Sequence, residues 1–257
     1  MPPTYRLLPG TWSDVAAASD LYVQSFDKEP LLDYMFPTRH TDPEPFHTWI
    51  VRRFRLRYWT SGYVLTMAFE YEEAEDEDGI DEGSSGGGDE VVKEKNTRQV
   101  QGRGRAVGFT WWHRPAASPT LNERWLTPYA WLSSVVTTLL NLHSRLFPIP
   151  SIDAHNLGIY DRVFRTLEPE LLNSPRRRAA WYLSSLGVDP AVQGRGVGDL
   201  LVRDGLRAAD RAGVATWLVG LRGLERYYDR FGFVEVARAN VGELKDWEGG
   251  AVMFRGE

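Results

Sequence analysis

The 257-residue chain contains no cysteine. Disulfide bonds, thiolate metal sites and a cysteine acyl-enzyme are therefore excluded, and the absence fits a reducing compartment. The chain has no run of about 18 apolar residues, and its first residues have no apolar stretch of the kind found in secretory signals. The five histidines show no metal-ligand spacing. We therefore expect a soluble cytoplasmic protein with no metal and no membrane partner.

Acidic residues are concentrated in one segment. Residues 71–95 hold eleven Asp or Glu and two Lys, while the whole chain has a formal charge of −5, so the remainder carries about +4. This weak and scattered excess suits an anionic small ligand and is too small to favour nucleic acid. Residues 72–96 are acidic and rich in glycine, which predicts a disordered loop inserted in a hairpin.

The most informative stretch is residues 181–211. Residues 181–188 alternate loosely between large apolar and small side chains, which predicts a half-buried strand that ends at Asp189-Pro190. Residues 193–198, QGRGVG, then open a helix with one apolar face. A strand, a glycine-rich turn and a helix N-terminus form an anion site, because the first helical N–H groups have no internal partner.

The glycine spacing restricts the ligand. No Gly-Lys-Ser/Thr is present, which excludes a P-loop, and no suitable acidic residue follows about 20 positions later, which disfavours a dinucleotide site. The pattern that fits is Q/R-x-x-G-x-G/A, formed by Gln193, Gly196 and Gly198 after Leu-Gly-Val-Asp-Pro. It resembles the acetyl-CoA signature of the GNAT superfamily of N-acetyltransferases. Residues 228–233, YDRFGF, resemble a second motif of that family, Tyr-x-x-x-Gly-Phe.

The resemblance implies an α/β (α+β) fold with a central mixed, mostly antiparallel sheet that is flanked by helices and splayed at its central strands. It implies a single acetyltransferase domain over residues 1–257, with the acidic loop at 72–96 and a helical insert at 115–175 outside the family pattern. It also implies acetyl-CoA as co-substrate. The expected cofactor-binding residues are Leu186, Gly187, Val188, Gln193, Gly194, Arg195, Gly196, Val197, Gly198 and Tyr228.

Two of these residues are also expected to take part in the chemistry. The resemblance places the Val188 N–H opposite the thioester oxygen, as an oxyanion donor. It places Tyr228 where family members often carry the acid that protonates the leaving thiolate. Packing on the cofactor is the alternative role for Tyr228. The group that takes the proton of the amine is left open between Glu70, Asp189 and His113.

The acceptor side is expected to involve Phe26, Tyr34 and Phe36, because their segment resembles the first-helix region of GNAT proteins that acetylate small molecules. A purely structural role in the core is the alternative for Tyr34 and Phe36. Trp111 and Trp112 lie in a predicted strand and point to opposite faces, so one is expected in the core and the other at the acceptor site.

Further helices are predicted outside the motif, among them the following three. The helix over residues 46–59 has apolar positions four apart and carries Arg52, Arg53, Arg55 and Arg57, which we expect on a solvated face. Two more, near residues 121–147 and 156–172, are expected to pack on the sheet and to narrow the acceptor pocket. The arginines at 176–178 are expected in a solvated turn, and a contact to the CoA phosphates is the alternative.

The predicted function is acetyl transfer to the amine of a small molecule by direct attack in a ternary complex. The long insert and the many aromatic residues favour a small, partly apolar acceptor. A protein or peptide acetyltransferase, acting on an N-terminus or a lysine, remains an alternative, as does a non-catalytic acyl-CoA sensor. No nucleic-acid partner is expected, and the chain is expected to be a monomer or a homodimer.

Overall fold

The structure, a computed structural model, describes residues 3–71, 104–115 and 128–257. The predicted acidic loop at 72–96 and the first part of the insert lie outside the described residues. The strands are β1 (Thr4–Pro9), β2 (Tyr63–Tyr71), β3 (Arg105–His113), β4 (Trp181–Val188), β5 (Thr216–Gly220), β6 (Val234–Arg238) and β7 (Ala251–Arg255). The α-helices are α1 (Asp14–Ser25), α2 (Pro30–Met35), α3 (Glu44–Trp59), α5 (Pro128–Leu146), α6 (Ala154–Leu157), α7 (Ile159–Leu171), α8 (Pro175–Arg178), α9 (Val197–Arg211) and α10 (Glu225–Asp229).

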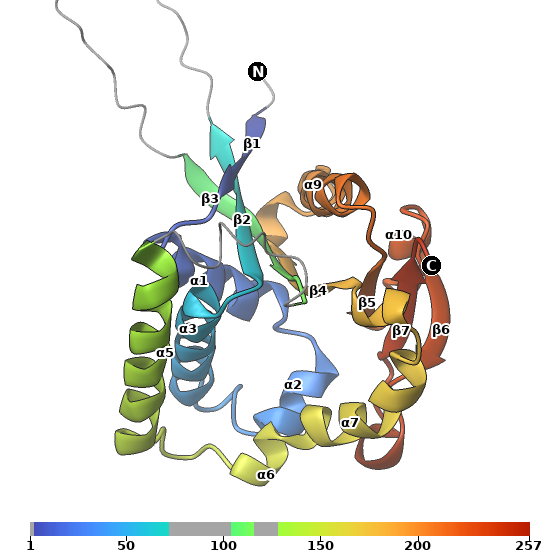
Figure 1. The fold of residues 1–257 in the computed structure, drawn as a ribbon. Helices are drawn as coiled ribbons and strands as arrows, with labels where there is room; N and C mark the ends of the chain where they lie inside the picture. Colours follow the sequence, from blue (N-terminus) through green and yellow to red (C-terminus); the bar gives the residue numbers. More distant parts are fainter. Residues whose placement is uncertain (1–2, 72–103, 116–127) are drawn as a thin grey trace, which may run out of the picture.

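The strands form one sheet in the order β1-β2-β3-β4-β5-β7-β6 (Figure 1). Each neighbouring pair is antiparallel except β4 and β5, which are parallel. The connection from β4 to β5 runs through α9, as expected for a parallel crossover. The predicted fold class, a mostly antiparallel mixed sheet flanked by helices, is therefore confirmed.

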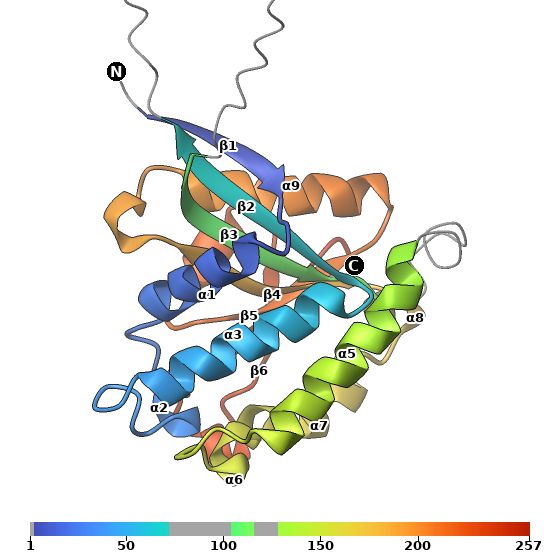
Figure 2. The same cartoon turned by 90° about the vertical axis from the view of Figure 1, so that its left-hand side faces the viewer.

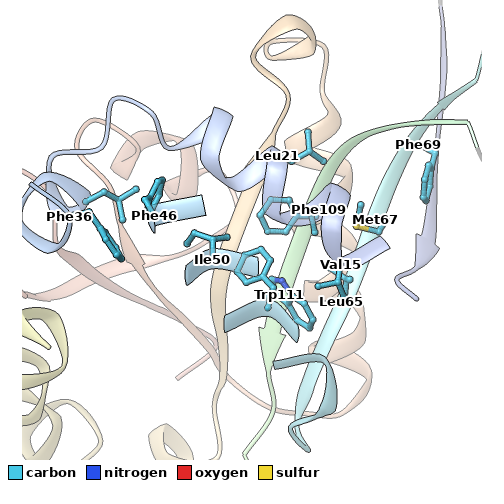
Figure 3. Packing of buried hydrophobic residues seen from close by; sticks show 13 residues of the cluster. Val15, Leu21, Phe36, Phe46, Ile50, Leu65, Met67, Phe69, Phe109 and Trp111 are labelled. Atoms are coloured by element: carbon cyan, nitrogen blue, oxygen red, sulfur yellow. The ribbon is translucent and has the colours of Figure 1, made fainter. Parts of the chain in front are cut away.

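Helices cover both faces of the sheet (Figure 2). Helices α1 and α3 lie on one face of β1 to β4, and α9 lies on the other. The core beneath α1 and α3 contains Ile50, Met67, Phe109 and Trp111 (Figure 3). Trp112 faces the opposite layer and packs so closely on α9 that a Cβ added to Gly205 would lie 2.1 Å from its Nε1 atom. The two tryptophans thus point to opposite faces, as predicted.

The insert does not pack as predicted throughout. Helix α5 lies along α3 rather than on the sheet (Figure 2), and the Ser133 hydroxyl donates to the Trp59 carbonyl at 2.7 Å. The far side of α5 is apolar yet exposed, at Leu132, Val135, Leu139, Leu142 and Leu146. The expected helix over 156–172 is divided at Gly158 into α6 and α7. Helix α7 does reach the sheet, where Phe164 stacks on Trp217 of β5 at 5.5 Å between ring centroids.

The arginines at 176–178 lie in the short helix α8 instead of a simple turn, because Ser174 caps it by accepting from the Arg177 N–H. None of the helices within the described ranges combines the length and the apolar character needed to cross a bilayer.

Candidate active site

The two halves of the sheet diverge after a short parallel junction. Strands β4 and β5 pair only from Trp181 to Leu183, opposite residues 216–218. Beyond Leu183, β4 pairs with β3 alone. An extra residue, Ser184, interrupts the β3–β4 register at this point, since Trp112 pairs with Leu183 while Trp111 pairs with Ser185. A cavity of about 960 Å³ occupies the space that opens between the strands.

The open edge of β4 presents backbone groups to this cavity. The Asp189 N–H donates to the Val107 carbonyl of the neighbouring β-ladder at 2.9 Å. Because successive residues of a strand direct their backbone groups to opposite edges, the N–H and C=O of Val188 face away from β3. The Gln193 amide nitrogen donates to that Val188 carbonyl at 3.1 Å, which confirms its direction. The Val188 N–H is therefore available at the cavity wall.

The glycine turn forms one end of the cavity. Gly194 and Gly196 have φ values of 78° and 84°, a region that side chains with a Cβ disfavour, and a Cβ at either would meet nothing within 4 Å. Gly196 begins α9 without a side-chain cap. Among the described residues, the backbone N–H groups of Gly194 and of residues 196–199 have no hydrogen-bond acceptor. Open space above unpaired helix N–H groups is suited to a phosphate.

Most of the predicted cofactor residues meet at this cavity. Its wall includes Leu186, Val188, Gln193, Gly194, Gly196, Val197, Gly198 and Tyr228. Gly187 and Arg195 do not line it. Gly187 turns toward the opposite layer, where an added Cβ would meet Phe109 and Ser25, and Arg195 projects into solvent.

Tyr228 lies on the cavity wall. It belongs to the short helix α10, and its ring packs on Tyr227 and Phe233 at 5.1 and 6.0 Å between centroids. Burial is the largest cause that raises the pKa of its hydroxyl above the ordinary value of 10. The hydroxyl therefore stays protonated at neutral pH.

The other end of the cavity is formed by α1, α2, α3 and α7. Of the predicted acceptor residues, Phe26 lines it, stacked on Tyr22 at 4.2 Å between ring centroids. Tyr34 and Phe36 do not, because α2 turns them toward neighbouring parts of the core. Trp111 and Trp112 are both buried under helices and neither reaches the cavity. Tyr34, Phe36, Trp111 and Trp112 therefore lie outside the cavity wall.

None of the three candidate bases lines the cavity. Glu70 and Asp189 are both bound to Arg105, at 2.7 Å from its terminal nitrogens. His113 is half-buried beside Tyr63, and burial, together with the charge of Arg57, lowers the pKa of its imidazole below 6.5. The carboxylates on the wall are instead Asp161 of α7 and Asp199 of α9.

Sequence reasoning also missed several wall residues, above all Arg57. It was expected on a solvated face, yet it is only 9% exposed and its Nη1 donates to the Ser185 hydroxyl at 3.0 Å. Arg57 follows Ile50 by seven residues and Phe54 by three, which places it on the apolar face of the helix. This spacing is the feature of the sequence that could have predicted its burial. Tyr160 and Tyr182 were missed too, since no local pattern relates the insert to the central strand.

No group of three or more metal-ligating side chains that could hold an ion occurs within residues 3–71, 104–115 and 128–257. The cavity combines unpaired helix N–H groups at one end, a free strand edge and an aromatic end.

Comparison with known proteins matches part of the chain to a family and the fold to solved structures. Residues 163–233 match the family described as the acetyltransferase (GNAT) family. A Corynebacterium glutamicum structure described as "histone acetyltransferase HPA2 and related acetyltransferase" is 18% identical, has a TM-score of 0.52, and is matched over 99% of this chain and 96% of that one. A Brucella melitensis GNAT family acetyltransferase in complex with acetyl-CoA is 15% identical, with a TM-score of 0.39 and coverage of 90% and 83%.

Proposed function

Because residues 163–233 match the GNAT acetyltransferase family, we propose that the chain transfers acetyl from acetyl-CoA to the amine of a small molecule, by direct attack in a ternary complex. One observation carries the proposal. A single cavity extends from the unpaired N–H groups at Gly196 past the free edge of β4 to an end lined by aromatic side chains. Such a cavity can hold donor and acceptor together, which direct transfer requires.

The donor end of the cavity suits acetyl-CoA. The N–H groups of Gly194 and of residues 196–199 would hold the pyrophosphate at the start of α9. The open edge of β4 at Leu186 and Val188 would pair with the amide groups of the pantetheine arm. The arm would lie beside the part of β4 after Leu183, where β5 no longer pairs with it. Gln193 would act indirectly, because its amide fixes the Val188 carbonyl.

In the proposed acetyl transfer, each of the wall groups has one role. The amine nitrogen bonds to the thioester carbon, the C–S bond breaks, and the products are an amide and free CoA thiol. The Val188 N–H donates to the oxygen that becomes negative. Tyr228 donates its hydroxyl proton to the departing thiolate. The proton of the amine leaves through water, and Asp161 and Asp199 are the wall carboxylates that such water can reach.

The aromatic lining of the acceptor end favours a small, partly apolar acceptor. Tyr22 of α1, Phe26 of the turn after α1, and Tyr160 and Phe164 of α7 line this end. We further propose that residues 1–257 act as one acetyltransferase domain in the cytoplasm, as a monomer or a homodimer.

A thiol-release assay tests the proposal. The full chain is mixed with acetyl-CoA and a panel of polyamines, arylamines, aminoglycosides and lysine peptides, and CoA thiol is measured. We expect release with a small amine, with the acetylated amine found by mass spectrometry. Turnover of peptides alone would establish the protein acetyltransferase instead, and acetyl-CoA binding without any turnover would establish the sensor.

A further inference from the structure

Arg57 is a buried cation at the aromatic end of the cavity. Its guanidinium donates to the Ser185 hydroxyl at 3.0 Å and lies over the rings of Phe54 and Tyr63, each 5.4 Å from the guanidinium carbon. None of these partners is anionic. Within the described residues no carboxylate pairs with it, although buried charges are normally paired.

A second cation stands next to it. Arg53 precedes Arg57 by one helical turn, so both project from the same face of α3 toward the cavity. Arg53 lies over the ring of Trp49 at 4.9 Å and has no carboxylate partner among the described residues. Burial, with the positive charge of Arg53, lowers the pKa of Arg57 to about 10, and it remains a cation at neutral pH.

The carboxylates of the cavity wall do not pair with these two arginines. Asp199 is paired with Arg230 at 3.2 Å, at the donor end. Asp161 is exposed on α7, and its charge adds to burial in raising the pKa of the Tyr160 hydroxyl. Within the described residues neither Arg57 nor Arg53 forms an ion pair with a carboxylate, so both guanidiniums can receive an anionic ligand.

We propose that the acceptor is an amine that also carries a carboxylate, and that Arg57, assisted by Arg53, binds this carboxylate. The inference rests on the proposed function of the same cavity. A guanidinium presents two parallel N–H donors that match the two oxygens of a carboxylate, which a lysine ammonium cannot do. The surrounding tyrosine and phenylalanine rings accommodate an apolar linker between the amine and the acid.

The positions of Ser185 and Val188 indicate the length of this linker. Ser185, which contacts Arg57, precedes Val188 by three residues, a distance of about 10 Å along a strand. An amine placed at the thioester beside Val188 would therefore be several bonds from its carboxylate. ω-Amino acids and aminomethyl benzoates fit this spacing better than α-amino acids do.

The test compares acidic amines with matched neutral ones. The pairs are 6-aminohexanoate against hexylamine and 4-(aminomethyl)benzoate against benzylamine, with an aminoalkyl phosphate as a third arm. We expect wild-type kcat/KM to favour the carboxylate of each pair by about 10- to 100-fold, the range for a charged hydrogen bond. A preference for the phosphate over both carboxylates would overturn the assignment of a carboxylate.

Two variants of Arg57 and one control variant distinguish carboxylate binding from a structural role. Arg57→Met should bring the acid-to-neutral ratio of kcat/KM close to one, and Arg57→Lys should restore only part of it, because the fork of donors is lost. Arg55→Met, an exposed arginine of the same helix, should leave both the ratio and the activity unchanged. If Arg57 only clamped Ser185, its loss would lower both members of a pair equally, and that result would overturn the inference.

The outcomes also distinguish this inference from the proposed function. Turnover of neutral amines without any preference for acids would refute the carboxylate and leave the acetyltransferase intact. Calorimetric binding of acetyl-CoA with no turnover of any amine would refute both.

Discussion

The indole Nε1 of Trp247 donates to the carboxylate of Glu29 at 2.8 Å, although the two residues are 218 positions apart. The same carboxylate oxygen caps α2 by accepting from the Leu31 N–H at 3.1 Å. Both side chains are buried, and Trp247 lines the cavity. This hydrogen bond therefore joins the acceptor side of the fold to its C-terminal part.

Trp247→Phe should destabilise the protein by about 1–3 kcal/mol, because it removes the donor and leaves a buried carboxylate oxygen short of a partner. Thermal or urea unfolding measures the loss. Glu29→Gln is the matched control, since an amide oxygen can still accept both hydrogen bonds. Equal stability of Trp247→Phe and wild type would show that the bond contributes nothing.

The same pair predicts a dependence of stability on pH. Burial is the main cause that raises the pKa of Glu29 above 4.5, so the folded state binds its proton more tightly than the unfolded state. The stability from this group is fully present below pH 4.5 and is lost as the pH rises through the raised pKa. We expect the advantage of Glu29→Gln over wild type in Tm to grow between about pH 4 and 8. A difference that is constant with pH would contradict this.

Gly196→Asp should abolish acetyl-CoA binding, weakening the Kd by more than about 100-fold, since it brings a negative charge to the phosphate end of the cavity. Calorimetry gives the Kd. Gly213→Asp is a matched control, because Gly213 also has a positive φ, 66°, and open space around its Cα, at the other end of α9. Unchanged affinity in a folded Gly196→Asp protein would refute the site.

Tyr228→Phe should lower turnover about 100-fold with little change in the apparent affinity for acetyl-CoA, because the ring still packs. The high-pH limb of the wild-type profile should lie above pH 10, since burial raises the pKa of the hydroxyl. Tyr34→Phe, outside the cavity wall, serves as control. A silent Tyr228→Phe together with a raised KM in Tyr228→Ala would instead establish a packing role.

Gly205→Ala should destabilise the protein by about 1–3 kcal/mol, although alanine is ordinarily the better helix residue. The reason is that its Cβ would lie 2.1 Å from Nε1 of Trp112, and a buried indole has no room to move. Urea unfolding compares it with Arg211→Ala at the exposed end of α9. A stabilised Gly205→Ala would mean that the α9 layer is more loosely packed than described.

The sequence predicts the donor half of the site better than the acceptor half. The strand, turn and helix around Gly194, Gly196 and Gly198 are local, so residue types and spacing suffice to place them. The acceptor half is assembled from segments more than 100 residues apart, such as Arg57 and Tyr160. Alternation along β3 shows that Trp111 and Trp112 face opposite sides, but it cannot show that helices cover both.

The three-pair junction between β4 and β5 has a consequence for how the sheet opens. Antiparallel pairing holds together the β1-β2-β3-β4 ladder and, separately, the β5-β7-β6 ladder. Among the described residues, the strand pairing between the two ladders is limited to residues 181–183 and 216–218. Cooperative opening units tend to follow such weak boundaries. In native-state hydrogen exchange the two ladders should therefore release their amide protons at different opening free energies. A ligand that contacts both ladders should make their two opening free energies more similar.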